Sequence, residues 1–266
     1  MERLVAASAE ELIDRYFAAL VRGDSKWTWL VVAILLAVAP SYLALAESFS
    51  SNLVVQDDAR QFIFWMAKWR DPTLFRGDLL ADYWESVSPW LYVAFYRVFD
   101  LLGIPPLIAS KLMPPVLIVA TVFFAYRVAF ALGNHAPVAF LCAILVLLMI
   151  VRNNSVFSAT PRGFALPAFL AVLDGLVRGR MAYATIAQFM LCGIYPQLAL
   201  VSLGAAGFTV LRWSPAPRFD FSRRSLGMIG LMAAATLGAL LPLLLDAGKY
   251  GPVSYTHLTL PTNSRV

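Results

Sequence analysis

The feature that most limits how this chain can fold is a series of long apolar runs. The first, residues 27–46, holds 20 residues without a charged side chain, and about 20 apolar residues let a helix cross a hydrocarbon core of about 30 Å. Six more runs follow, several of them shorter than the roughly 17 residues expected of a full span. They are residues 106–132, 137–151, 163–177, 181–194, 196–211 and 226–245. The pattern predicts an all-α fold, a polytopic transmembrane helical bundle of about seven spans, with some helices tilted or partly re-entrant.

Composition supports a membrane protein and argues against other classes. The chain is 60% hydrophobic and 14% charged, whereas a soluble domain is about half apolar and a quarter charged. The net charge of +5 could indicate nucleic acid, but the basic residues lie between apolar runs instead of in one patch, so no nucleic-acid partner is expected. Cys142 and Cys192 lie inside apolar runs without a CxxC partner, and His135 and His257 are the only histidines. Neither a disulfide framework nor a zinc site is predicted.

The distribution of lysine and arginine predicts the orientation in the membrane. The segment at residues 89–102 is short for a span; if it does not cross, seven spans remain and the N-terminus is cytoplasmic. The short outer loops then carry only Arg152 and Arg162, as the positive-inside rule requires. The cytoplasmic basic residues are Arg3, Arg15, Arg22, Lys26, Arg127, Arg178, Arg180, Arg212, Arg218, Arg223 and Arg224. We therefore expect an integral membrane protein with a cytoplasmic N-terminus.

The two ends of the chain differ from its middle. Residues 1–26 are polar and predict a short amphipathic helix on the cytoplasmic surface. Ala44-Leu45-Ala46 resembles a signal-peptidase site, but the long polar segment before the apolar run favours an uncleaved anchor. Residues 252–266 resemble translated sequencing-adapter read-through, so the transmembrane domain is taken as residues 27–251. We expect the natural protein to continue further, which would make this chain an N-terminal fragment.

The first outer loop, residues 47–105, is the most polar segment beside the membrane, and it opens with Asp57 and Asp58. Interfacial helices are expected in it at residues 59–69, from Asp78 onward, and at residues 89–102. In the first of them, one helical face carries Phe62, Trp65, Met66 and Trp69. Because aromatic rings on a short amphipathic helix favour the membrane–water boundary, we expect this face to lie in the membrane interface.

Three polar features fall on the same outer face in this topology. They are the acidic loop, the segment at residues 152–162, and the sequence Tyr195-Pro196-Gln197. Carboxylates, an arginine and a hydroxyl-rich segment at one membrane boundary are the groups that a site for a lipid-linked substrate needs. The sequence therefore predicts that these features converge.

Several local motifs resemble those of a known enzyme class. A first span, an outer loop opening with Asp57-Asp58 and then many short spans is similar to the GT-C class of integral-membrane glycosyltransferases. The motifs are Asp57-Asp58-Ala59-Arg60-Gln61, Asp82-Tyr83, Ser158-Ala159-Thr160-Pro161-Arg162 and Tyr195-Pro196-Gln197. They resemble a group of bacterial membrane proteins of that build, over about residues 27–246. The resemblance implies an enzyme of the bacterial inner (plasma) membrane that transfers a sugar from a polyprenyl-phosphate donor to an acceptor at the outer face.

The resemblance also implies roles for individual residues. A carboxylate, Asp57 or Asp58, would take the proton of the acceptor hydroxyl. Cations would hold the departing phosphate, with Arg162 first and Arg60 and Lys111 behind it. The full substrate-binding set is Arg60, Asp82, Tyr83, Lys111, Arg162, Tyr195 and Gln197. No metal or other cofactor is predicted, although a divalent metal between Asp57, Asp58 and Asp82 stays an alternative; the partners are the polyprenyl-phosphate-sugar lipid and membrane lipids.

Plainer interpretations compete with these roles. The aspartate pair could simply cap a helix, and Asp78, Asp82 and Glu85 could form a solvated helix face. Arg162 and Lys111 could only snorkel toward the membrane surface. For the whole protein, the alternatives are a transporter or flippase of a lipid-linked substrate and a non-catalytic membrane scaffold.

Overall fold

The structure is a computed structural model that describes residues 25–51, 54–212, 218–219 and 221–246. The predicted amphipathic segment at residues 1–26 falls almost wholly outside these ranges, and the tail at residues 252–266 falls entirely outside them. The described ranges contain all seven predicted apolar runs and nearly all of the first outer loop.

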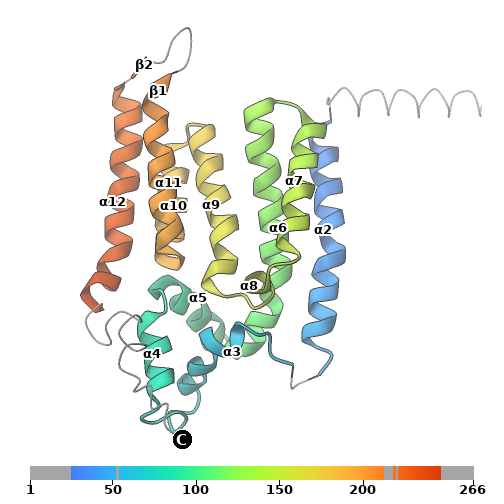
Figure 1. Cartoon of the computed structure of the whole chain (residues 1–266), viewed down its shortest axis with the longest axis vertical. Helices are drawn as coiled ribbons and strands as arrows, with labels where there is room; N and C mark the ends of the chain where they lie inside the picture. The colour runs from blue at the N-terminus through green and yellow to red at the C-terminus, as the bar shows by residue number, and fades with distance from the viewer. Residues whose placement is uncertain (1–24, 52–53, 213–217, 220, 247–266) are drawn as a thin grey trace, which may run out of the picture.

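The described chain is helical, as the apolar runs predict. Three helices are long and apolar enough to cross a membrane: α2 (Lys26–Ser48), α6 (Pro106–Gly133) and α12 (Arg223–Asp246). Shorter helices lie alongside them in Figure 1: α7 (Ala136–Ile150), α9 (Pro161–Val177), α10 (Met181–Ile194) and α11 (Pro196–Gly207). Strands are confined, within the described ranges, to the antiparallel pair β1 (Leu211–Arg212) and β2 (Arg218–Phe219). The predicted all-α fold is confirmed, and three of its helices have the length and apolar character of membrane spans.

Small residues set how closely the helices pack. In one half of the bundle, Ala33 and Ala37 of α2 and Ala139 and Ala143 of α7 are buried around α6. In the other half, α10 lies between α9, α11 and α12; a Cβ added at Gly175 of α9 would lie 2.9 Å from the Cα of Ala184 in α10. Close backbone approach through Gly and Ala is typical of helices that associate in lipid, where apolar burial alone gives little driving force.

Polar side chains inside the bundle satisfy one another. The Gln188 amide of α10 donates to the Thr236 hydroxyl of α12 at 2.8 Å, and the Ser202 hydroxyl of α11 donates to the Gln188 carbonyl oxygen. All three residues are buried. An unpaired polar group costs several kcal/mol in hydrocarbon, roughly 2–7 by transfer measurements, so this network ties α10, α11 and α12 together.

The polar loop after α2 folds into a compact layer of short helices under the bundle (Figure 1). Its elements are α3 (Ala59–Phe62), the 3-10 helix η1 (Phe64–Trp69), α4 (Leu79–Val87) and α5 (Trp90–Leu101). The helices expected from Asp78 and over residues 89–102 are confirmed within a residue. The Asp78 carboxylate caps α4 by accepting hydrogen bonds from the backbone N–H groups of Leu80 and Ala81.

The single helix predicted over residues 59–69 is wrong in detail. The α-helix ends after Phe62 and continues as the 3-10 helix from Phe64. The tighter turn places Trp65 and Met66 in the protein core of this layer, 1% and 0% exposed, and the Trp65 indole N–H donates to the Phe62 carbonyl. Tertiary burial therefore changes the helix type, and these two side chains pack against protein rather than at the membrane interface.

Candidate functional site

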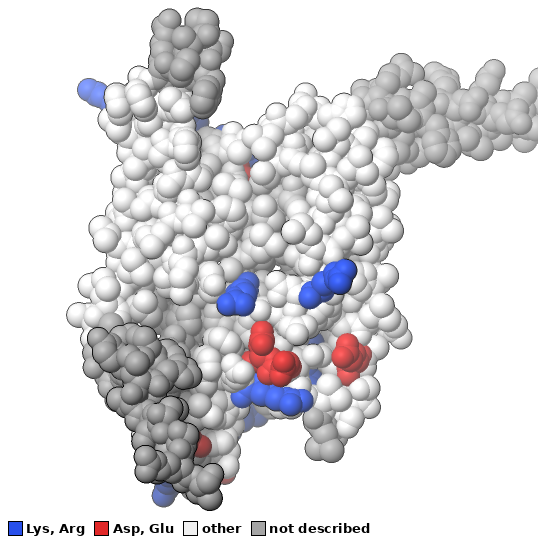
Figure 2. All heavy atoms as spheres, in the orientation of Figure 1, with Lys and Arg blue, Asp and Glu red and all other residues white. Residues whose placement is uncertain are grey.

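A polar cavity of about 280 Å³ lies between the short-helix layer and the lower ends of the bundle helices. It is lined by residues from three separate parts of the chain. They are Asp58, Gln61, Phe62 and Trp84 of the outer loop; Ser155, Thr160, Pro161 and Arg162 around the start of α9; and Tyr195 between α10 and α11. Acidic and basic side chains gather at this end of the molecule in Figure 2, whereas the sides of the bundle in that view are nearly free of charge. The cavity contains a residue from each of the three polar features expected to converge.

Asp58 is the carboxylate of the pair that enters the cavity. The Ser155 hydroxyl donates to its Oδ2 at 3.1 Å, although the two residues are 97 positions apart. Asp58 stands directly before α3, yet its side chain makes no capping hydrogen bond to that helix. Asp57 is exposed and does not line the cavity. The geometry thus separates two neighbouring aspartates that are equivalent by sequence alone, and helix capping does not account for Asp58.

The segment that carries Ser155 is held from several sides. The Asn153 side chain caps the short helix α8 (Asn154–Phe157) by accepting from the Ser155 N–H. The Thr160 hydroxyl and N–H both donate to the Ser155 carbonyl. Ala159 has φ +47°, in a left-handed region that costs about 1–2 kcal/mol for an L-residue. Such strain persists only where the surrounding contacts fix the backbone. The segment that carries the Ser155 hydroxyl is therefore held in place beside Asp58.

Two buried tyrosines of α5 supply part of that support. The hydroxyl groups of Tyr92 and Tyr96 both donate to the Ala159 carbonyl, at 3.2 and 2.9 Å. Burial raises the pKa of both phenols well above the ordinary value. Both therefore stay protonated and able to donate through the physiological pH range.

Gly163 allows α9 to approach this segment. A Cβ at position 163 would lie 2.4 Å from the Ser155 carbonyl oxygen and 3.1 Å from the Val156 Cα. These are backbone atoms of a buried segment and cannot rotate away as a side-chain end can. Position 163 requires glycine because a Cβ would collide with these backbone atoms, and not because of its φ angle.

We expect Gly163→Ala to destabilise the fold by about 1–3 kcal/mol, the usual cost of overpacking a closed site, and to displace Ser155 from Asp58. The measurement is the midpoint of denaturant-induced unfolding in detergent. Gly204→Ala in α11 is the matched control, because no atom lies within 4 Å of its added Cβ. An unchanged midpoint for Gly163→Ala would contradict the close approach.

Arg162 is the cation that faces the cavity. It occupies the second position of α9, after Pro161, and its side chain is exposed. Within the described residues it makes no ion pair or side-chain hydrogen bond, so its guanidinium is available to a ligand. The start of a helix adds positive electrostatic potential there. The cavity therefore pairs one carboxylate with one free arginine.

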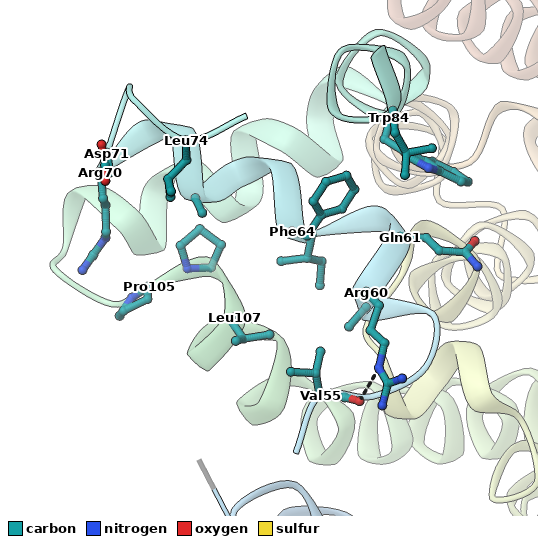
Figure 3. A pocket seen from close by; sticks show the side chains of 15 residues that line it. Val55, Arg60, Gln61, Phe64, Arg70, Asp71, Leu74, Trp84, Pro105 and Leu107 are labelled. Carbon is teal, nitrogen blue, oxygen red and sulfur yellow. Dashed lines mark hydrogen bonds between the residues drawn. The ribbon is translucent and has the colours of Figure 1, made fainter. Parts of the chain in front are cut away.

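An apolar groove of about 650 Å³ adjoins the polar cavity. The two share Gln61 and Trp84 as lining residues. Figure 3 shows the groove from close by: Phe64, Leu74, Pro105 and Leu107 border it, with Gln61 and Trp84 to one side. Arg60 lines this groove and not the polar cavity, and its Nε–H donates to the Val55 carbonyl at 3.2 Å. An apolar space of about 650 Å³ thus adjoins the cavity that Asp58 and Arg162 line.

The structure places four other predicted site residues away from the polar cavity. Asp82 pairs with Lys68 at 2.7 Å, and the Tyr83 ring packs edge-on against Trp84. Lys111 is buried in α6 with its ammonium 5.5 Å from the centre of the Phe49 ring. Gln197 is exposed at the start of α11. No group of three His, Cys, Asp or Glu side chains suited to a metal ion occurs in the described ranges.

Lys68 gives Asp82 a structural role. Its ammonium also contacts Glu85 at 3.2 Å, so one cation holds two carboxylates of α4. The hydrogen bond to Asp82 raises the pKa of Lys68 above its ordinary value of 10.5. A raised folded-state pKa stabilises the fold below the unfolded-state pKa, and that stabilisation is lost as the pH rises through the folded-state pKa.

We expect Lys68→Met to lower the free energy of unfolding at pH 7 by about 1 kcal/mol, the upper range for a surface ion pair. The difference from wild type should stay constant up to about pH 10 and shrink above 10.5, measured by denaturant unfolding at each pH. Lys68→Arg, which keeps the charge, is the control. A difference that grows with alkaline pH would show that the pair does not act this way.

Sequence reasoning assigned no role to several residues that line the cavity. Ser155 and Trp84 carry no charge and lie in none of the motifs, whereas Gln61 and Thr160 lie in motifs but were assigned no function. A second omission is Asp174 of α9, which is fully buried and paired with Arg127 and Arg178. A carboxylate within an apolar run, followed by an arginine four residues later, was the available signal.

Comparisons with known proteins add no family to this description. No protein-family model, curated protein or solved structure matches the chain.

Proposed function

We propose that this protein is a membrane glycosyltransferase of the GT-C type, and that the polar cavity is its site of sugar transfer. The observation that carries the proposal is the meeting of Asp58 and Arg162 in one cavity that adjoins an apolar groove. A polyprenyl-phosphate sugar has the same three parts: a hydroxyl-rich sugar, a phosphate and a long apolar chain. The groove would take the start of the chain, the arginine the phosphate, and the cavity the sugar.

The chemistry assigns one step to each charged group. Asp58 accepts the proton of the acceptor hydroxyl while the hydroxyl oxygen bonds to the anomeric carbon. The bond between that carbon and the phosphate oxygen breaks, and polyprenyl phosphate leaves with the electron pair. Arg162 faces the negative charge that develops on the leaving phosphate. Ser155 fixes Asp58 through Oδ2, which leaves Oδ1 for the acceptor.

The orientation follows the charge distribution. With seven crossings and a cytoplasmic N-terminus, this site lies at the outer face of a bacterial inner membrane. Helices α7, α10 and α11 are shorter than a full span, and tilting or local thinning of the bilayer would let them cross. A transporter or flippase would need the substrate to pass the bundle, and no observation favours that path.

The test is release of polyprenyl phosphate from a panel of polyprenyl-phosphate hexoses by the purified protein in detergent, with simple sugars and lipids as acceptors. We expect Arg162→Gln to lower the rate about 10²-fold or more, as loss of a charge-stabilising donor does in other sites. Arg152→Gln is the matched control, because Arg152 is an exposed arginine of the same segment that does not line the cavity. Equal rates for the two variants would refute the assignment of the phosphate site.

A further inference from the structure

A second cavity lies at the opposite end of the bundle. It has a volume of about 260 Å³ and is formed where α2 begins, α6 ends and α9 meets α10. Figure 1 shows the start of α2 at the far end from α3 and α8, which border the candidate site. Helix α9 connects the two sites, because Arg162 at its start lines the candidate site and Arg178 just after its end lines this cavity. At about 1.5 Å per residue, these two positions are roughly 25 Å apart. This cavity is separate from the proposed sugar-transfer site, and the two share no lining residue.

Its lining carries an excess of positive charge. Lys26, Arg127, Arg178 and Arg180 all line it. The buried Asp174 carboxylate pairs with Arg127 at 2.7 Å and with Arg178 at 2.7 Å. Four cations and one carboxylate leave a formal charge of +3. Lys26 and Arg180 have no ion-pair partner within the described ranges, and Arg127 and Arg178 share one carboxylate, so three positive charges are unneutralised.

The paired arginines also keep donors for a ligand. Arg127 uses Nε and Nη2 for Asp174, and Arg178 uses Nε for Asp174 and Nη2 for the Arg127 carbonyl. The Nη1 groups of both have no acceptor in the described part of the chain. Asp174 thus fixes two guanidinium groups side by side without consuming all their N–H groups, which is the arrangement that binds phosphate oxygens.

The apolar part of the lining indicates that such a phosphate belongs to a lipid headgroup. Trp27 is exposed, and Leu30, Phe123 and Phe130 complete the wall between α2 and α6. The volume lies just below the roughly 300 Å³ at which typical small-molecule pockets begin, so it holds a headgroup and not acyl chains. Chains attached to that headgroup can continue along the exposed apolar surfaces of α2 and α6.

We propose that this basic cavity binds the phosphate of an anionic phospholipid headgroup in the cytoplasmic leaflet. A basic pocket between membrane helices on that side suits such a headgroup, and the leaflet carries the anionic lipids. The proposal rests on the cytoplasmic location of the N-terminus, and it does not depend on the sugar-transfer reaction. It predicts that the protein retains phosphatidylglycerol selectively, through Lys26 and Arg180.

The experiment is native mass spectrometry of the delipidated full-length chain titrated with dioleoylphosphatidylglycerol or dioleoylphosphatidylcholine. A Lys or Arg near an anionic lipid surface contributes about 1 kcal/mol, or about fivefold in affinity. Arg180→Gln should weaken phosphatidylglycerol binding about fivefold and Lys26→Gln/Arg180→Gln about 25-fold. Arg180→Lys should retain wild-type affinity within about twofold. Because neither residue has an ion-pair partner in the described structure, these variants should fold normally, as gel filtration will show.

Arg223→Gln is the matched control, since Arg223 is an exposed arginine at the same end that does not line the cavity. It should change affinity less than about twofold. An equal loss of affinity for Arg223→Gln would show that binding depends on the overall positive charge at this end of the protein, and it would overturn the proposal. Equal affinity for the two lipids would overturn it as well, and so would displacement of phosphatidylglycerol by millimolar inorganic phosphate, which would identify a free-phosphate site.

Discussion

Asp58→Asn should reduce sugar transfer by about 10²–10⁴-fold, the usual contribution of a positioned general base. Asparagine keeps the shape of the side chain and can still accept the Ser155 hydroxyl through its amide oxygen, so the cavity should keep its form. The variant loses the ability to take a proton from the acceptor. We expect the fall in the rate at saturating donor, with donor binding changed little, because Asp58 acts on the acceptor and not on the phosphate.

Asp57→Asn is the closest control that the chain offers. The residue is adjacent, carries the same charge and lies outside the cavity, so its activity should stay within about threefold of wild type, as expected of a change at an exposed site. Measured rates of polyprenyl phosphate release for the two variants, at equal membrane insertion, decide between them. A larger loss for Asp57→Asn would reverse the assignment of the base.

The largest loss of stability is expected from Asp174→Asn. The Asp174 side chain is 0% exposed, and the two arginines that it holds are 28% exposed. Removing the carboxylate leaves two close guanidinium groups without a counter-ion. Loss of one partner from a buried pair costs about 3–5 kcal/mol; because water reaches the arginines, we expect about 2–4 kcal/mol here, read from the midpoint of denaturant unfolding in detergent.

Asp100→Asn tests whether burial decides that cost. Asp100 also joins two arginines, Arg70 at 2.6 Å and Arg97 at 2.9 Å, but those side chains are 40% and 44% exposed. The connectivity is the same and the solvent screening is stronger, so the loss should be about 1 kcal/mol. A cost for Asp100→Asn equal to or above that of Asp174→Asn would contradict the role given to burial.

The apolar runs predict most of the helices because each span depends on local hydrophobicity. The run at residues 181–194 coincides with α10, and the helix expected from Asp78 onward begins one residue later, as α4 at Leu79. The break after Phe62 could not be predicted in the same way. Residues 59–69 have a helical apolar period, but burial of Trp65 and Met66 against the loop's own helices sets the final geometry.

The charged residues of the candidate site could be predicted from the sequence, but the residues that hold them in position could not. Asp58, Arg162 and Tyr195 lie in motifs, and the topology predicted from the charges places them on one face. The choice of Asp58 over Asp57 depends on Ser155, 97 residues away, and no local pattern encodes that contact. Asp82 shows the opposite case: its motif indicated substrate, yet its ion pair with Lys68, 14 residues earlier, gives it a structural role.

The most direct test of the central claim uses Gln61, which lines both the polar cavity and the apolar groove. In a Cys142→Ser background, which removes the exposed native thiol and leaves the buried Cys192, Gln61→Cys is labelled by a membrane-impermeant maleimide added from outside. Gln197→Cys, exposed but outside both spaces, is the control. Polyprenyl phosphate should slow labelling at position 61 and leave position 197 unchanged. Equal labelling rates at position 61 with and without polyprenyl phosphate would contradict the account.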